Sequence, residues 1–292
     1  MRARQTVERR QLGLSLKRYR NLKGVSQAEV GAVIGRVDSR ISMVEDGTAT
    51  LGNDELTCVL DFLGVPDGER ATVLELGARA RKRLRRSASD PQPYTDTLPG
   101  SFQRLADMEA DAVTICCYEP GVVPGLLQAP GYIRAVIDSC DGVFWESSQA
   151  EIENRFMFRR KRQITTLEAD EPKKLEFVFT EEAIDCREDD AGIMREQLEH
   201  LLHLDKRHPS ITMQVLRLAD MRNPASSGGV TVLDFAGSAP DVAFASTSYG
   251  PSTYFDGVVD TANLLRAFKK TQELARDHED TVEFIRRKLE EI

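Results

Sequence analysis

The segment from Ser26 to Gly47 constrains the fold of this chain more than any other, because it holds two short helical patterns joined by a tight turn. Ser26 is followed three residues later by Glu29, which is the pattern of a capping box at the start of a helix. Gly35 stands where the first short helix would end, and Gly47 where the second would end. Two short helices cross at a steep angle when their apolar sides meet around a small residue. The residues that fit this requirement are Val30, Ile34, Ile41, Val44 and Gly31.

Further helices are predicted on both sides of this segment, so that residues 12–63 form an all-helical region. An earlier helix ends at Gly24, as a glycine at a helix C-terminus should, and a later helix is capped by Asn53 or Asp54. Each of these two helices carries an apolar stripe at helical spacing. The stripes are Leu12, Leu16, Tyr19 and Leu22 in the earlier helix, and Leu56, Val59, Leu60 and Leu63 in the later one. A fifth helix is predicted over residues 67–86.

This arrangement resembles the helix-turn-helix of the phage-repressor and Cro (XRE-type) family, with no gap in its spacing. The matching residues are Val25-Ser26-Gln27, Val30-Gly31, Ile34-Gly35, Ile41-Ser42, Val44-Glu45 and Gly47. The resemblance implies a DNA-binding domain whose second short helix, from Asp38 or Ser39 to Glu45, enters the major groove by its N-terminal end. Met43 and Asp46 depart from the family, whose members often carry polar or basic residues there. A helix-turn-helix that serves only protein contacts is the alternative.

The resemblance also implies which residues meet DNA. Gln27 is expected to approach a phosphate, as are Thr48 and Thr50 in the loop after the second short helix. Arg40 is expected to reach either a phosphate or a guanine. The residues expected to face base edges or the DNA backbone are Asp38, Ser39, Ser42 and Met43.

Two acidic residues of the same region have other expected roles. Asp38 either accepts a hydrogen bond from a cytosine amine or caps the helix that it begins. Glu45 is implied by the family to form a partly buried ion pair with Arg20, and this pair is expected to be structural and not to read bases.

Charge is unevenly distributed along the chain, whose formal net charge is −8. Residues 1–98 hold 17 Lys and Arg against 13 Asp and Glu, a net charge of +4, and the remainder hold 22 against 34, a net charge of −12. The basic part suits DNA, whereas the acidic part does not bind nucleic acid unaided. Three parts are predicted: a helix-turn-helix DNA-binding domain over 1–86, a linker over 87–99 and a regulatory or interaction domain over 100–292.

The end of the fifth predicted helix is strongly basic, with six Lys or Arg among residues 79–86. This run either contacts the DNA backbone or another domain electrostatically, or is a solvated helix face.

Strand-like and helix-like segments alternate after residue 99, which favours an α/β or α+β domain with a central sheet. The strand-like runs are Val113–Tyr118, Leu175–Thr180, Ile211–Leu216, Val230–Phe235 and Val242–Ser246. The helix-like stretches are residues 100–109, 125–138, 148–168, 191–206, 257–275 and 278–291. The predicted fold class is therefore an all-α N-terminal helix-turn-helix domain followed by an α/β or α+β C-terminal domain.

The second half resembles the companion domain of actinobacterial proteins called antitoxin-like transcriptional regulators. The resemblance covers the whole domain. The residues that carry it include Phe102-Gln103-Arg104-Leu105, Tyr118-Glu119-Pro120, Val123–Gln128, Tyr132, Arg155, Arg159, Arg162-Gln163, Glu181-Glu182-Ala183 and Met194–Leu198. Members are often encoded beside a small partner protein, which implies a protein-binding, antitoxin-like or sensor role.

One basic helix face of this half stands out. Arg155, Arg159 and Arg162 recur at helical spacing on one face. They either hold an anion or pair with acidic residues of the same domain.

Catalytic and metal-binding patterns are weak. His200 and His203 share a helix face with Asp205 nearby, but no further ligand follows at metal-site spacing. The Glu181-Glu182 pair points in two directions and has no nucleophile or cofactor loop beside it. No catalytic residue, metal or cofactor is therefore predicted. The five cysteines, which contain no CxxC pair, are expected to be buried free thiols, with Cys58 on an apolar helix face.

The predicted function is that of a transcriptional regulator that binds double-stranded DNA at a two-fold operator as a homodimer. Its C-terminal domain is expected to sense a small-molecule effector or a partner and to mediate dimerisation. The alternative is an antitoxin-like interaction protein that binds a small partner protein and autoregulates. Candidates for the dimer contact, or for the core, are Leu264, Leu265, Phe268, Phe284, Ile285 and Leu289. With no transmembrane or signal segment recognised, a cytoplasmic location, nucleoid-associated when bound to DNA, is expected, with no membrane partner.

Overall fold

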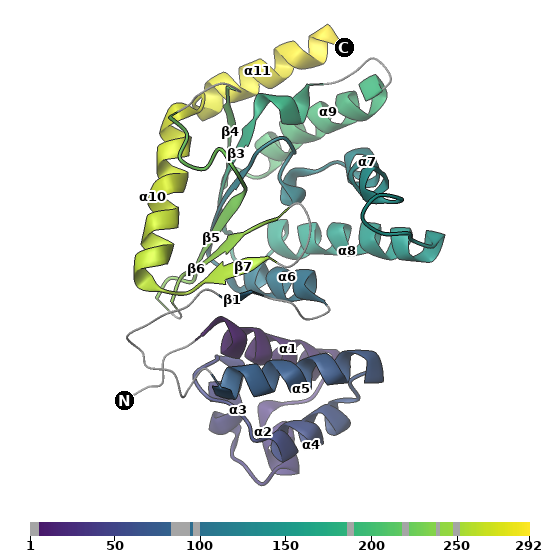
Figure 1. Ribbon diagram of the computed structural model, residues 1–292, viewed down its shortest axis with the longest axis vertical. Helices are drawn as coiled ribbons and strands as arrows, with labels where there is room; N and C mark the ends of the chain where they lie inside the picture. Colours follow the sequence, from purple (N-terminus) through teal and green to yellow (C-terminus); the bar gives the residue numbers. More distant parts are fainter. Residues whose placement is uncertain are drawn as a thin grey trace. The chain divides into compact units, whose positions relative to one another are not determined.

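The computed structural model describes residues 6–82, 94–95, 100–185, 190–217, 222–237, 240–247 and 252–292. Most of the predicted linker 87–99, the basic residues 83–86 and Cys186 lie outside the described residues. The chain, which Figure 1 shows coloured along its sequence, forms two compact units. The first unit comprises Met1–Asp111, Gly237–Val242 and Gly250–Asp260, and the second comprises Ala112–Ala236, Ala243–Tyr249 and Thr261–Ile292.

The first unit begins with the helices expected from the sequence (Figure 1). They are α1 (Val7–Lys23), α2 (Gln27–Val33), α3 (Asp38–Glu45), α4 (Asn53–Leu63) and α5 (Asp67–Lys82). The unit also contains α6 (Ser101–Asp111) and an antiparallel pair of short strands, β1 (Tyr94–Thr95) and β7 (Thr253–Phe255). Neither strand was predicted, because two or three residues are too few to show the alternation that marks a strand.

One apolar core joins α1 to α5 and buries most of the predicted stripes. Leu22 is an exception: it is 72% exposed, because at 100° per residue it lies about 80° around α1 from Leu12. Cys58 is also exposed and not buried as predicted, since it lies about 200° around α4 from the buried Leu56. The N-cap of α4 is Gly52, not Asn53 or Asp54.

Two glycines let helices of the first unit approach closely. A Cβ atom on Gly13 of α1 would lie 2.3 Å from the carbonyl oxygen of Glu45 and 2.4 Å from that of Val44. A Cβ atom on Gly31 of α2 would lie 2.5 Å from the carbonyl oxygen of Arg36. The backbone at the end of α3 therefore packs directly on α1, and a side chain at Gly13 has no room.

The second unit contains a mixed sheet built from β2 (Thr114–Glu119), β3 (Lys174–Thr180), β4 (Ile211–Leu216), β5 (Val230–Asp234) and most of β6 (Val242–Ala245). Its strand order is β6-β5-β2-β3-β4. β2 pairs in parallel with β3, as β3 does with β4, and β5 pairs antiparallel with β2. Each predicted strand of this set is confirmed to within one residue at both ends.

Helices connect these strands and cover the sheet. They are η2 (Gly125–Leu127), α7 (Pro130–Cys140), α8 (Gln149–Leu167), η3 (Glu181–Ile184), α9 (Ala191–Arg207), α10 (Val258–Leu274) and α11 (His278–Glu291). The predicted helix over 125–138 is broken, because Pro130 occupies the first turn of α7 and a new helix starts there.

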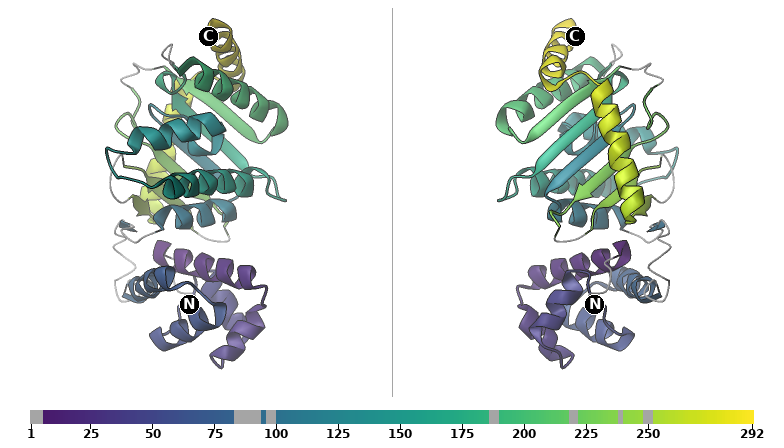
Figure 2. Two further views of the ribbon diagram at one scale, coloured as in Figure 1. Left: turned by 90° about the vertical axis from the view of Figure 1, so that its right-hand side faces the viewer. Right: turned by 90° about the vertical axis from the view of Figure 1, so that its left-hand side faces the viewer.

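The layers follow from the parallel pairing. Parallel neighbouring strands need a crossover connection, and such connections are almost always right-handed. When successive crossovers move in the same direction along the sheet, their helices therefore lie on the same face of the sheet. α7 and α8 connect β2 to β3, and α9 connects β3 to β4. Figures 1 and 2 show these three helices on one face of the sheet and α10 on the other.

Several polar groups lie inside the second unit. Cys116 on β2 is buried and donates to Glu176 Oε2 at 3.1 Å, and burial together with Glu176 raises the pKa of the thiol to about 12. Cys116 and Cys117 are thus buried free thiols, as predicted. At the end of β2, burial raises the pKa of Glu119 to about 7, although the positive charge of Arg162 opposes this shift.

Gly13→Ala is predicted to destabilise the first unit by roughly 2–4 kcal/mol, because its methyl group would overlap the carbonyl oxygens that end α3. Gly68→Ala is the matched control: Gly68 lies in α5, with no atom within 4 Å of an added Cβ. That substitution should be neutral or stabilising by up to about 1 kcal/mol. Urea unfolding of both variants measures the difference, and equal stabilities would contradict the close approach of α1 and α3.

Glu119→Gln is predicted to change how stability depends on pH. Between the ordinary glutamate pKa and about 7, folded Glu119 keeps a proton that the unfolded chain loses, so stability falls as pH rises through this window. The variant lacks this loss, and relative to the natural chain it should gain roughly 1–3 kcal/mol between pH 4 and pH 8. Urea unfolding at both pH values measures the gain. Glu182→Gln, at an exposed position, is the control and should show no such gain.

Candidate nucleic-acid interface

The turn between α2 and α3 is built as the sequence predicts. Ser26 Oγ accepts from the N–H of Glu29 at 3.2 Å, and Glu29 Oε2 accepts from the N–H of Ser26 at 2.7 Å, which completes the capping box. α2 ends with Ile34 as its C-cap, and Gly35 turns the chain with a φ of 63° in the left-handed region. Glycine tolerates this conformation at low cost, so the turn can be short and α3 starts at Asp38.

α3 has one buried side and one exposed side. Ile41, Val44 and Glu45 are buried against the rest of the first unit. Asp38 and Ser39 at its N-terminus are exposed, and Met43 is 44% exposed. The exposed side therefore begins at the helix N-terminus, which is the end that a recognition helix presents to the major groove.

A single carboxylate ties three helices together behind this exposed side. Arg20 of α1 donates from Nε to Glu45 Oε1 at 2.6 Å and from Nη2 to Glu45 Oε2 at 2.9 Å, and its Nη1 donates to the carbonyl of Val25 at 3.1 Å. Gln27 at the start of α2 donates from Nε2 to Glu45 Oε2 at 2.8 Å. The hydrogen bonds to Glu45 raise the pKa of Arg20. Such bidentate, charge-assisted pairs fix geometry as well as add stability.

The loop after α3 is held by side chains that were expected to contact DNA. Arg40 Nη2 donates to the carbonyl of Thr50 at 2.6 Å, and Thr48 Oγ1 donates to the carbonyl of Met43 at 2.9 Å. Arg40, Thr48 and Thr50 are all half-buried. In the free protein, Arg40 and Thr48 thus position the loop that carries Thr50.

Two further polar residues of α3 make local hydrogen bonds. Asp38 Oδ1 accepts from the N–H of Ser39 at 2.7 Å, but Asp38 is the first residue of α3, whose N-cap is Val37 and has no side-chain capping hydrogen bond. Ser42 Oγ lies 3.5 Å from Asp46 Oδ2, so Asp46 faces the neighbouring turn of α3. The structure brings all the predicted residues of this region onto α1, α2, α3 and the loop that follows.

Comparison with known families separates the two parts of the chain. A family described as a helix-turn-helix domain matches residues 11–73, and a family described as a domain of unknown function, DUF5753, matches residues 102–287. The second match covers well over half of the chain. The protein belongs to the DUF5753 family. No curated protein and no solved structure matches the chain.

The helix-turn-helix gives this DUF5753 protein the character of a DNA-binding transcriptional regulator, in agreement with the sequence prediction. The match begins within α1 and ends within α5, so it includes the carboxylate of Glu45 and all its partners.

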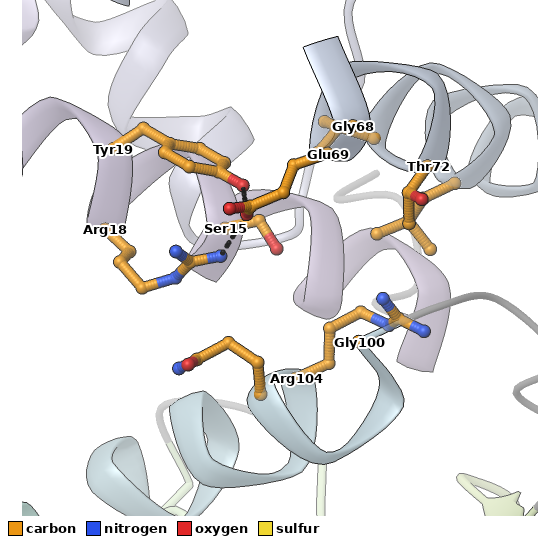
Figure 3. Close-up of a pocket in the computed structure, with 11 residues that line it drawn as sticks. Ser15, Arg18, Tyr19, Gly68, Glu69, Thr72, Gly100 and Arg104 are labelled. Atoms are coloured by element: carbon orange, nitrogen blue, oxygen red, sulfur yellow. Dashed lines mark hydrogen bonds and ion pairs between the residues drawn. The ribbon is translucent and has the colours of Figure 1, made fainter. Parts of the chain in front are cut away.

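A cavity of about 300 Å³ lies in the first unit, lined by α1, α5 and the start of α6 (Figure 3). On its wall the Tyr19 hydroxyl donates to Glu69, and Arg18 Nη2 lies 3.9 Å from the same carboxylate. Burial and the hydrogen bond to Glu69 raise the pKa of Tyr19 to about 12. Sequence reasoning missed this cavity, because its walls come from helices far apart in the chain and have no shared motif.

Two other candidate residues of the sequence, Asp205 and Glu181, form pairs with side chains of the C-terminal segment. Asp205 Oδ1 lies 2.8 Å from His278 Nε2, and Glu181 Oε1 lies 3.0 Å from Arg276 Nη2. Over the described ranges, no cluster of three or more His, Cys, Asp or Glu could hold a metal ion. Within those ranges, too, no helix has the length and apolar character needed to cross a bilayer.

Glu45→Gln is predicted to destabilise the first unit by roughly 2–3 kcal/mol, because Arg20 would lose its charged partner in a largely buried site. Glu75→Gln is the matched control, since Glu75 forms an exposed pair with Arg79 one turn away on α5. That control should change stability by less than about 0.5 kcal/mol. Thermal unfolding of the full chain measures both, and equal effects would refute the structural role of the Glu45 carboxylate.

Proposed function

We propose that this protein is a sequence-specific transcriptional regulator whose α3 reads the major groove and whose C-terminal domain senses a ligand or partner and mediates dimerisation. The exposed N-terminal side of α3, held rigidly from behind by Arg20 and Glu45, is the observation that carries the proposal. A reading helix must keep its orientation while its outer side chains stay free to meet base edges.

Base contacts are assigned to the exposed side of α3. Asp38 and Ser39 stand at the N-terminal end of the helix, and Ser42 and Met43 follow one turn later. A serine hydroxyl can meet donors or acceptors of a base, whereas a methionine suits the methyl group of thymine. This mixed set favours an operator with at least one A·T pair under Met43.

Backbone contacts are assigned to residues that flank α3. Gln27 uses one donor for Glu45, and its amide group carries a second N–H that can reach a phosphate oxygen. Arg40, Thr48 and Thr50 lie along the loop after α3, where phosphate contacts would fix the register of the helix on the duplex.

Dimerisation is assigned to the last two helices. A two-fold operator requires two reading helices about one DNA turn apart, and hence a dimer contact. Phe268 and Ile285 are fully buried within one chain and belong to the core. Four of the candidates for the dimer contact remain partly exposed on α10 and α11: Leu264, Leu265, Phe284 and Leu289.

The second candidate function is that of an antitoxin-like protein that binds a small partner protein and represses its own gene. Met157 and Ile164 on α8 favour it, because each is 57% exposed and exposed apolar side chains mark protein contacts when they gather. Co-purification of the chain with the product of a neighbouring small gene would favour this function. Release of DNA by a small molecule alone would favour the first.

Replacing both Ser39 and Arg40 with alanine is predicted to weaken binding to the operator at least tenfold, because a base contact and the anchor of the loop after α3 are lost together. The operator is first selected by the full-length chain from random duplexes, and binding is then measured by mobility shift. Ser39→Ala alone keeps the Arg40 anchor and should weaken binding less.

The matched control is Arg207→Ala, which removes an exposed arginine from α9, a helix of the second unit that is not assigned to the dimer contact. It should leave operator affinity unchanged. If the Ser39 and Arg40 double variant binds as tightly as the control while its thermal unfolding is unaltered, α3 is not the reading helix.

A further inference from the structure

The outer side of α8, on the surface of the second unit, carries two exposed apolar side chains at helical spacing. Met157 and Ile164 are each 57% exposed. They stand seven positions apart in the sequence, which is close to two turns of the helix, so they lie nearly in line and about 10 Å apart along its axis. Apolar side chains lined up on one side of a helix form a stripe that a second helix can cover.

Two basic residues lie on the same side of α8, between these apolar side chains. Arg160 and Lys161 stand three and four positions after Met157, and residues at these spacings are neighbours on a helix surface. Arg160 donates from Nη1 to Gln163 Oε1 at 2.7 Å, and this acceptor is uncharged. Lys161 is exposed and makes no hydrogen bond with any residue that the structure describes. Within the described ranges, neither positive charge is paired with a carboxylate.

The acidic residues at the two ends of this side of α8 are already paired. Glu153, one turn before the apolar pair, forms an ion pair with Arg134 of α7 at 3.1 Å. Glu168, one turn after the apolar pair, forms an ion pair with Arg207 of α9 at 2.9 Å. Each end is therefore neutralised by an arginine from a neighbouring helix, and the positive charge of this side is concentrated at its centre.

A second copy of this side of α8 would be a poor partner for it. In a two-fold contact centred on this side, Arg160 and Lys161 of one chain would lie against Lys161 and Arg160 of the other. Like charges that face each other across an interface cost free energy. The side therefore suits a different protein, whose contacting residues are acidic.

DNA and anionic membranes are also negatively charged, but they are broad surfaces. Residues 99–292 carry a net charge of −12, so a broad anionic surface that approached the second unit would meet this acidic excess and be repelled. A single helix is only about 10–12 Å across with its side chains. It can cover the basic centre of α8 without approaching the acidic residues elsewhere on the unit.

We propose that the outer side of α8, formed by Met157, Arg160, Lys161 and Ile164, docks an acidic amphipathic helix of a partner protein. Apolar residues of that helix would cover Met157 and Ile164, together with the aliphatic stem of Lys161. Its Asp or Glu residues would face Arg160 and Lys161. In such a contact the buried apolar residues supply most of the affinity, whereas the charges set the choice and orientation of the partner.

This surface gives a partner chemistry to the second candidate function and rests on that function only for its effect on transcription. α10, one of the two helices assigned to the dimer contact, lies on the opposite face of the sheet (Figures 1 and 2). Docking can be measured without DNA, so its failure leaves the mobility-shift result unchanged. A partner protein that binds elsewhere on the chain would preserve the second candidate function and refute this surface alone.

The test places the photo-reactive amino acid p-benzoylphenylalanine at position 157 of the full-length chain, in the cells that produce the protein naturally. Irradiation is expected to link this position to one protein. Mass spectrometry of the linked peptide should then identify an acidic segment with apolar residues at helical spacing. The same amino acid in place of Lys270, an exposed residue of α10, is the control and should not label that protein.

Calorimetry with the purified partner then measures the charge contribution. Lys161→Glu should weaken binding at least tenfold, because the acidic helix would meet a negative charge at the centre of the contact. Lys206→Glu makes the same change at an exposed position of α9 and should leave binding unchanged. Replacing an acidic residue of the linked segment with lysine should restore binding to the Lys161→Glu variant.

Three results would overturn the proposal. Position 157 could label no protein, or only a second copy of this chain, DNA or lipid. The linked segment could contain no acidic residues. Finally, Lys161→Glu could bind the partner as tightly as the natural chain does, with its thermal unfolding unaltered.

Discussion

The geometry of the helix-turn-helix depends on the carboxylate of Glu45. It sits at the end of α3, receives two hydrogen bonds from Arg20 of α1 and a third from Gln27 of α2. Short helices of seven and eight residues have little stability of their own. Their relative orientation must come from contacts between them. The absence of a side chain at Gly13 allows α1 to come close enough for this, so one ion pair and one glycine together set where the exposed side of α3 points.

In the second unit, the β-sheet sets the relative orientation of the helices. Its parallel strands require crossover helices, and these gather on one face. α8 is part of the first crossover, and its position beside η2 and α7 brings Arg155 over Trp145 and Arg159 to Gln128. Backbone topology thus brings together polar side chains that are far apart in the sequence, such as those of Gln128 and Arg159.

Much of this could be predicted from local sequence, because the relevant signals act over a few residues. The capping box at Ser26, the glycine that ends α1 and the five strand patterns of the second unit were confirmed. Two local signals were misread. Cys58 is exposed because of its angle around α4 from the buried Leu56, and the helix before Pro130 is broken because a proline in the first turn marks a new helix. Gly13 was overlooked, although an isolated glycine in a helical pattern is itself a sign of close packing. The cavity beside Tyr19 has no sequence signature at all.

The sheet also has a consequence for how the chain acquires its structure. Cys116 of the central strand β2 pairs with Val232 of β5 on one side and with Glu176 of β3 on the other. β2 can therefore form its strand pairs only after residues that follow it by 60 positions or more have been synthesised. Contacts among α1 to α5 span far shorter stretches of chain, and such local contacts form faster than distant strand pairs. During synthesis from the N-terminus, the helix-turn-helix would therefore take shape while the sheet is still incomplete. The helix-turn-helix domain would thus be folded before the DUF5753 domain is complete.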